Sequence, residues 1–216
     1  MAIREDFLRP RTDRENAARR AAILDAAEAL IRENHHQRFS VNEVAKRVGV
    51  SQSTIFLHFR NREELVTTLY IRVGRAFFDA FLGRLHEGMS DTAFCEAFID
   101  AAQEHPCFRL MRPMVMRVVE ECLSREFIHV AVADIVAFRS VASARVEEVL
   151  GLTPGQGPIL MKGFVNQMCG AVQVDIRTLM AADDMSEAVA AAIRASDFRS
   201  SFLSGAELLV KGIRHG

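Results

Sequence analysis

Residues 40–65, SVNEVAKRVGVSQSTIFLHFRNREEL, decide the fold of this chain, because three helix start signals follow one another closely there. Ser40 can cap a helix, with a Glu three positions later in the pattern of a capping box. Gly49 offers the left-handed backbone that ends such a helix, and Ser51 and Asn61 can cap two more. The stretch therefore predicts a helix-turn-helix followed by a third helix, an arrangement that lays one helix in the DNA major groove.

The middle helix of this motif begins with short polar side chains and ends with apolar ones. Ile55 and Phe59 are spaced to anchor its inner face, while its first turn carries groups of the kind that reach phosphates and base edges. The alternative is an ordinary corner between two helices, in which Ser and Thr serve only as caps. We predict DNA contacts from Ser40, Ser51, Gln52, Ser53, Thr54, Phe56, Leu57, His58 and Arg62.

A longer stretch, roughly residues 15–70, resembles the N-terminal domain of the tetracycline repressor (TetR) family. A long amphipathic segment, ILDAAEALIREN, precedes the motif, and the following positions match the family pattern in order and spacing: Phe39, Gly49, Val50, Ser51, Thr54, Phe59, Glu64 and Leu65. The chain departs from the pattern at Phe56, where the family usually has Tyr, and at Arg62, where it usually has Lys. The resemblance implies an all-α fold, with a three-helix DNA-binding domain followed by a larger helical effector and dimerisation domain.

The charge distribution is weakly asymmetric. The 216 residues have a net charge of -1, but residues 1–70 hold 12 Lys and Arg against 10 Asp and Glu, and residues 71–216 hold 15 against 18. Arginines crowd the N-terminus, and Pro10 is expected to keep the first dozen residues from forming a regular helix. We expect a flexible basic arm over 1–14 that reaches phosphates or the minor groove, or else a solvated terminus. The DNA-binding domain is then expected at 15–61 and the effector and dimerisation domain at 62–216.

Apolar periodicity predicts helices throughout the rest of the chain. Their expected ranges are 62–86, 91–104, 107–123, 126–150, 159–182, an Ala-rich segment at 183–195, and 198–213. Three Gly and two Pro at 151–158 predict a break between two of these helices.

Two late apolar stripes are candidates for a dimer interface. The resemblance implies that the helices at 159–182 and 198–213 form a four-helix bundle across a two-fold axis, although both stripes could instead face the chain's own core. The predicted interface residues are Met161, Phe164, Val165, Met168, Val172, Phe202 and Leu209.

Aromatic and Met side chains in the second domain could line a pocket for a small hydrophobic or aromatic effector, or could be solid core. Polar groups among apolar neighbours are candidates because burying them without a partner costs about 1 to 3 kcal/mol; they are Asn166 and Gln167, with Arg112 and Glu120 as further candidates. The predicted ligand-binding residues are Phe77, Phe81, Phe98, Phe108, Met111, Phe138, Asn166 and Gln167.

These observations favour a homodimeric, ligand-responsive repressor that binds a palindromic double-stranded DNA operator. An activator or a non-specific DNA-coating protein of the same fold is the alternative. An enzyme is not expected, because the sequence lacks a Gly-rich phosphate loop, an HExxH motif and a nucleophile elbow, and no cofactor is expected. Cys95, Cys107, Cys122 and Cys169 are spaced for neither zinc nor a disulfide framework and are expected to be buried, with redox sensing as the alternative. With no apolar leader and no run near the ~20 residues that span a bilayer, a cytoplasmic location without a membrane partner is expected.

Overall fold

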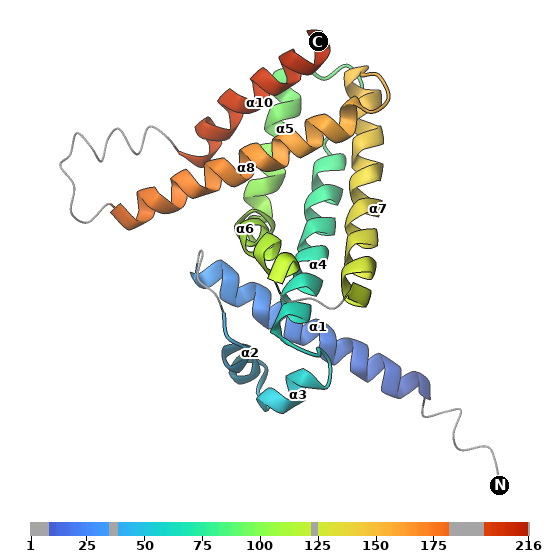
Figure 1. Cartoon of the computed structure of the whole chain (residues 1–216), viewed down its shortest axis with the longest axis vertical. Helices are drawn as coiled ribbons and strands as arrows, with labels where there is room; N and C mark the ends of the chain where they lie inside the picture. The colour runs from blue at the N-terminus through green and yellow to red at the C-terminus, as the bar shows by residue number, and fades with distance from the viewer. Residues whose placement is uncertain (1–8, 35–38, 122–124, 182–196, 216) are drawn as a thin grey trace.

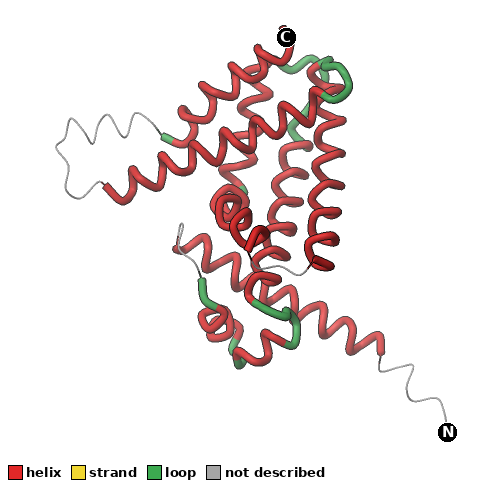
Figure 2. Tube along the Cα trace, in the orientation of Figure 1, coloured by secondary structure: helices red, strands yellow, loops and turns green. Residues whose placement is uncertain are grey.

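The computed structural model describes residues 9–34, 39–121, 125–181 and 197–215, which form helices joined by short turns, with no strand among them (Figures 1 and 2). The helices are α1 (Arg9–Asn34), α2 (Val41–Val48), α3 (Gln52–Phe56), α4 (Arg62–Leu82), α5 (Asp91–Glu104), α6 (Pro106–Glu121), α7 (Arg125–Leu150), α8 (Gln156–Ala181) and α10 (Phe198–His215). The all-α prediction is therefore confirmed. The predicted Ala-rich helix at 183–195 lies outside the described residues, as does Cys122.

Cap residues define the short helices as predicted. The Glu43 N–H donates to the Ser40 side-chain oxygen at 3.2 Å, and the Ser40 N–H donates back to the Glu43 carboxylate at 2.7 Å, which completes the capping box of α2. Gly49 ends α2 with φ of 74°, and no heavy atom lies within 4 Å of the position its Cβ would take. Glycine is therefore required there for its backbone freedom alone.

Two predicted helix starts were wrong, and α4 ends at Leu82, four residues before its predicted end at residue 86. α1 begins at Arg9, so residues 9–14 are helical rather than part of an arm; Pro10 is tolerated because amides in the first turn have no intrahelical partner. α8 begins at Gln156, inside the predicted break. Pro158 is again in a first turn, and Gly157 lets α8 approach α7, because a Cβ there would lie 2.3 Å from the Ser143 carbonyl oxygen.

The helices divide into an N-terminal group and a larger helical body. In Figure 1, α1, α2 and α3 lie together at one end, and α4 leads from them into the body beside α7, with α8 and α10 at the far end. Arg72 of α4 pairs with Asp25 and Glu28 of α1 at 2.6 and 2.7 Å. Arg75 of α4 pairs with Asp134 of α7 at 2.6 Å. α4 is thus connected to both groups.

Phenylalanine rings fill the centre of the helical body. The Phe77 ring stacks on Phe108 at 4.4 Å and meets Phe98 edge-on at 5.1 Å, and Phe98 stacks on Phe202 at 5.2 Å. Five of the predicted ligand-binding residues are at most 1% exposed and belong to this core: Phe77, Phe81, Phe98, Phe108 and Met111. Aromatic side chains at helical spacing are here packed against one another, so most of the predicted pocket is solid.

The predicted dimer stripe also lies mostly within the chain's own core. α8 and α10 pack against each other, and α10 packs on α5, so most of the predicted stripe is covered within the chain. The residues buried in this way are Met161, Phe164, Val165, Met168, Val172 and Phe202. Leu209 remains 38% exposed, and the same two helices also expose Ile159 and Leu208.

Candidate nucleic-acid interface

The first turn of α3 is held by its own hydroxyl groups. The Thr54 N–H donates to the Ser51 side-chain oxygen at 3.2 Å, and that oxygen also lies 2.8 Å from the hydroxyls of both Ser53 and Thr54. Ile55 and Phe59 are fully buried below, as predicted for the anchoring face. The outer face of α3 therefore has a defined orientation on the N-terminal group.

The outer face of α3 presents the side chains predicted to contact DNA. Ser51, Gln52 and Ser53 are exposed, and Thr54 and His58 are half-buried. Phe56 is 42% and Leu57 83% exposed, which is unusual for large apolar side chains. Ser40, also exposed, stands at the start of α2, where its hydroxyl donates to Glu43 at 2.7 Å.

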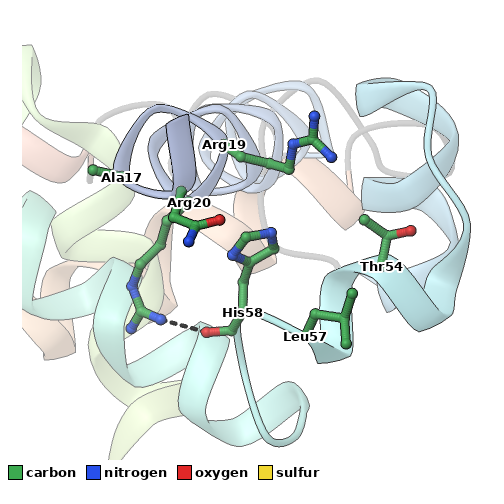
Figure 3. A pocket seen from close by; sticks show the side chains of 7 residues that line it. Ala17, Arg19, Arg20, Thr54, Leu57 and His58 are labelled. Carbon is green, nitrogen blue, oxygen red and sulfur yellow. Dashed lines mark hydrogen bonds between the residues drawn. The ribbon is translucent and has the colours of Figure 1, made fainter. Parts of the chain in front are cut away.

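A groove of about 410 Å³ separates α1 from the recognition helix α3 (Figure 3). One wall comes from α1 and the other from the end of α3 and the turn after it; the lining residues are Asn16, Ala17, Arg19, Arg20, Thr54, Leu57 and His58. In Figure 3, the Arg19 side chain extends along the groove, whereas Arg20 points down to the backbone of His58. The sequence did not predict that α1 forms one wall of a groove, because its arginines were interpreted as part of a basic N-terminus.

Arg20 attaches α3 to α1. Its guanidinium donates to the His58 carbonyl oxygen and lies over the Phe59 ring, 4.1 Å from the centroid. It also approaches the Glu64 carboxylate at 3.8 Å. Because these contacts saturate Arg20, the exposed Arg19 is the better cation of the pair for a phosphate.

Arg62 was predicted to contact DNA, but its side chain lies against Phe39 instead. Its Nε donates to the Phe39 carbonyl oxygen at 3.2 Å, and its guanidinium lies 5.4 Å from the centroid of the Phe39 ring. Its Nη2 is buried and has no hydrogen-bond partner among the described residues. Arg62 therefore binds the chain just before α2 rather than pointing outward, because the first turn of α4 packs against that segment.

A second, much smaller cavity lies in the helical body, between α4, α6, α7 and α8. It encloses about 10 Å³, and Phe108 and Phe138 are the predicted ligand-binding residues that border it. Asn166 is exposed instead, and Gln167 donates to the Ser201 carbonyl oxygen at 2.8 Å. The predicted polar pair is therefore not part of this cavity.

The cysteines of the described residues are buried or half-buried and free, as expected of Cys95, Cys107 and Cys169. Burial raises the pKa of Cys95 to about 12, and raises the pKa of Cys107 and Cys169 as well. No cluster of His, Cys, Asp or Glu suited to a metal ion occurs among the described residues. Within the same part of the chain, no helix combines the length and apolar character needed to cross a membrane.

Comparisons with known proteins agree with this geometry. Residues 23–69 match the family model of bacterial regulatory proteins, tetR family. A 71-residue stretch is 32% identical to the fatty acid metabolism regulator protein of Bacillus subtilis (strain 168); it covers 33% of this chain and only 34% of that relative. The crystal structure of the TetR family transcriptional regulator PfmR from Thermus thermophilus superposes with a TM-score of 0.53 at 15% identity, covering 88% of this chain and 97% of PfmR. The latter likeness shows the shared fold.

The fold and the exposed α3 define a helix-turn-helix protein with a helical body. Over residues 23–69, its N-terminal domain is that of the bacterial regulatory proteins of the tetR family.

Proposed function

We propose that this chain is a homodimeric, sequence-specific DNA-binding repressor that a small effector releases from its operator. The observation that carries the proposal is the open groove of about 410 Å³ beside the exposed first turn of α3. Its walls offer one exposed arginine, the Thr54 hydroxyl, the Asn16 amide and the His58 imidazole, which suit phosphates and base edges.

Two copies present two α3 helices, which enter successive major grooves of a palindromic operator. The apolar side chains left exposed on α8 and α10, Ile159, Leu208 and Leu209, support an association of copies through these helices. The interface proposed here is thus smaller than the stripe predicted from the sequence.

The effector acts through α4. This helix begins directly after the recognition segment, is ion-paired to α1 through Arg72, and passes through the aromatic core of the body. An effector that separates the helices of the body tilts α4 and changes the spacing of the two α3 helices. A tenfold preference for the conformation that does not bind DNA shifts the equilibrium by about 1.4 kcal/mol.

Fluorescence anisotropy on DNA from upstream of the protein's own gene, against a scrambled duplex and over a salt series, tests the proposal. We expect tight binding to the first duplex alone, lost when Thr54 and His58 are both replaced by Ala. Equal, salt-sensitive binding to both duplexes would instead indicate a DNA-coating protein. The Arg145→Gln variant, whose change lies on α7 where Arg145 pairs with the neighbouring Glu148, is the control and should bind as the wild type does.

A further inference from the structure

The small cavity of the helical body has aromatic walls from three helices. Tyr70 and Phe78 of α4 face Phe108 of α6, with ring centroids 5.4 and 5.9 Å from that of Phe108. Phe138 of α7 adds a fourth ring, 5.1 Å from Phe78. Walls of this kind suit a flat or aliphatic apolar group.

Two arginines line the same cavity, Arg112 from α6 and Arg139 from α7, and both are half-buried. Neither has an ion pair or a hydrogen bond among the described residues. Six other arginines of the described body behave differently, since each pairs with a carboxylate within 4 Å: Arg72, Arg75, Arg84, Arg145, Arg199 and Arg214. Two half-buried cations at one apolar cavity, with no counter-ion among the described residues, indicate a site for an anion.

Tyr70 supplies a third polar group at this place. Its side chain is 5% exposed, and burial raises its pKa to about 12 although the positive charges of Arg112 and Arg139 act in the opposite direction. The hydroxyl therefore keeps its proton at neutral pH and can donate it in a hydrogen bond.

We propose that Arg112 and Arg139 bind the carboxylate of an organic acid whose aromatic or aliphatic body occupies this cavity. The planar guanidinium fork matches a carboxylate in two parallel hydrogen bonds, which makes arginine better suited to this group than lysine. The acid is the effector of the repressor proposed above, and in this respect the inference rests on that function.

The acid has to open the cavity, because about 10 Å³ holds roughly one water molecule. Phe138 is the wall that moves most easily, since it is only half-buried and packs where α4 has Gly74 in place of a side chain; a Cβ at Gly74 would lie 3.3 Å from its ring. Arg139 also borders an open groove of about 160 Å³ between α7 and α8, which provides the entrance. Displacing Phe138 removes packing from α4, the helix that leads to α3.

The test uses the full chain and three acids, benzoate, 3-phenylpropanoate and octanoate, each compared with the primary amide of the same skeleton. Tyr70 is the chain's single Tyr and there is no Trp, so its fluorescence reports on the cavity directly; calorimetry gives the affinities. At least one acid should bind tenfold or more tightly than its amide, as a charge-assisted pair predicts. Arg112→Gln and Arg139→Gln should each remove that preference, whereas Arg145→Gln, the control on α7, should keep it.

Phe138→Ala provides a second test in which both arginines remain. It should bind the same acid more tightly than the wild type does, because the wall that closes the cavity is shortened, and should still prefer the acid to the amide. Equal affinity for acid and amide, an unchanged preference in both Arg variants, or no acid binding by either wild type or Phe138→Ala would overturn the site.

DNA binding is measured separately, so that the two proposals fail separately. Sequence-specific DNA binding without any acid binding would support the proposed regulator and overturn the proposed carboxylate site. Operator affinity is measured with and without the acid, with the amide and equal salt as controls. If acid binding depends on the arginines but operator affinity does not change, the carboxylate site is supported and its role as the effector switch is overturned.

Discussion

The groove between α1 and α3 is open and about 410 Å³ in volume, whereas the aromatic cavity between α4, α6, α7 and α8 encloses about 10 Å³. In the groove, polar side chains already face solvent on a helix fixed by Ser51, Ile55 and Phe59. In the cavity, a ligand must first displace packed rings. The surface proposed for DNA is therefore preorganised, while the cavity proposed for the effector couples ligand binding to a conformational change.

The largest expected effect comes from the aromatic core of the helical body, next to the cavity. Phe98→Ala removes a fully buried ring that contacts Phe77, Phe81, Phe164 and Phe202, and should lower the free energy of unfolding by about 3 to 5 kcal/mol. Urea unfolding at a fixed protein concentration measures this decrease in the free energy of unfolding.

The matched control for Phe98 is the same substitution on α3. Phe56 is 42% exposed, so Phe56→Ala should change the free energy of unfolding by no more than about 0.5 kcal/mol. If the two variants were equally destabilised, the distinction between a solvent-facing α3 and a packed body would be wrong.

Two neighbouring arginines of the groove should respond differently to the same substitution. Arg20→Ala should lower the free energy of unfolding by about 2 kcal/mol, because it removes the contacts to the His58 carbonyl and the Phe59 ring. Arg19→Ala should leave stability nearly unchanged and flatten the salt dependence of DNA binding by about one phosphate unit, since Arg19 is exposed along the groove. Thermal unfolding and anisotropy measure the two effects. An exchange of the two phenotypes would contradict the assignment.

Glycine has a different role in each region: Gly49 of the N-terminal group has a left-handed backbone, whereas Gly170 of the helical body has a helical one. Gly49→Ala should cost about 1 kcal/mol, because alanine resists the φ of 74° even though no atom obstructs its Cβ. Gly170 in the middle of α8 also has no atom within 4 Å of a Cβ, but lies on helical backbone. Gly170→Ala should therefore stabilise by about 0.5 to 1 kcal/mol. Denaturant unfolding of the pair gives the sign, and destabilisation by both would show that crowding, not backbone, decides.

Short-range signals explain why part of this structure was predictable. A cap bonds an amide only a few positions away, so Ser40, Ser51 and Asn61 were identified as caps from sequence. The exposed face of α3 follows from the same signals once its start is known.

Long-range pairings explain what was missed. The groove depends on the contact between Arg20 and His58, and Arg62 turns inward because it donates to the Phe39 carbonyl. Neither contact produces a periodic pattern in the sequence. Likewise, the apolar stripe containing Phe164 and Met168 was predicted to meet a partner subunit but is buried within the chain. Periodicity does not say whether a partner subunit or α10 covers such a stripe.

The smallest expected effect comes from the capping box at the start of α2, which Ser40 and Glu43 form. The Glu43 carboxylate accepts from the Ser40 N–H and hydroxyl, both at 2.7 Å, and these bonds hold its pKa below the ordinary value of 4.5. A carboxyl group with a lowered pKa in the folded state contributes stability above its unfolded pKa and loses that contribution as the pH falls through the folded value. The stability difference between wild type and Glu43→Gln should therefore be constant from neutral pH to about pH 5 and shrink below about pH 4.5. Urea unfolding of both proteins across that range measures the difference. A difference that does not change with pH would mean that the substitution acts through hydrogen-bond geometry alone, and that the charge of Glu43 contributes nothing to the cap.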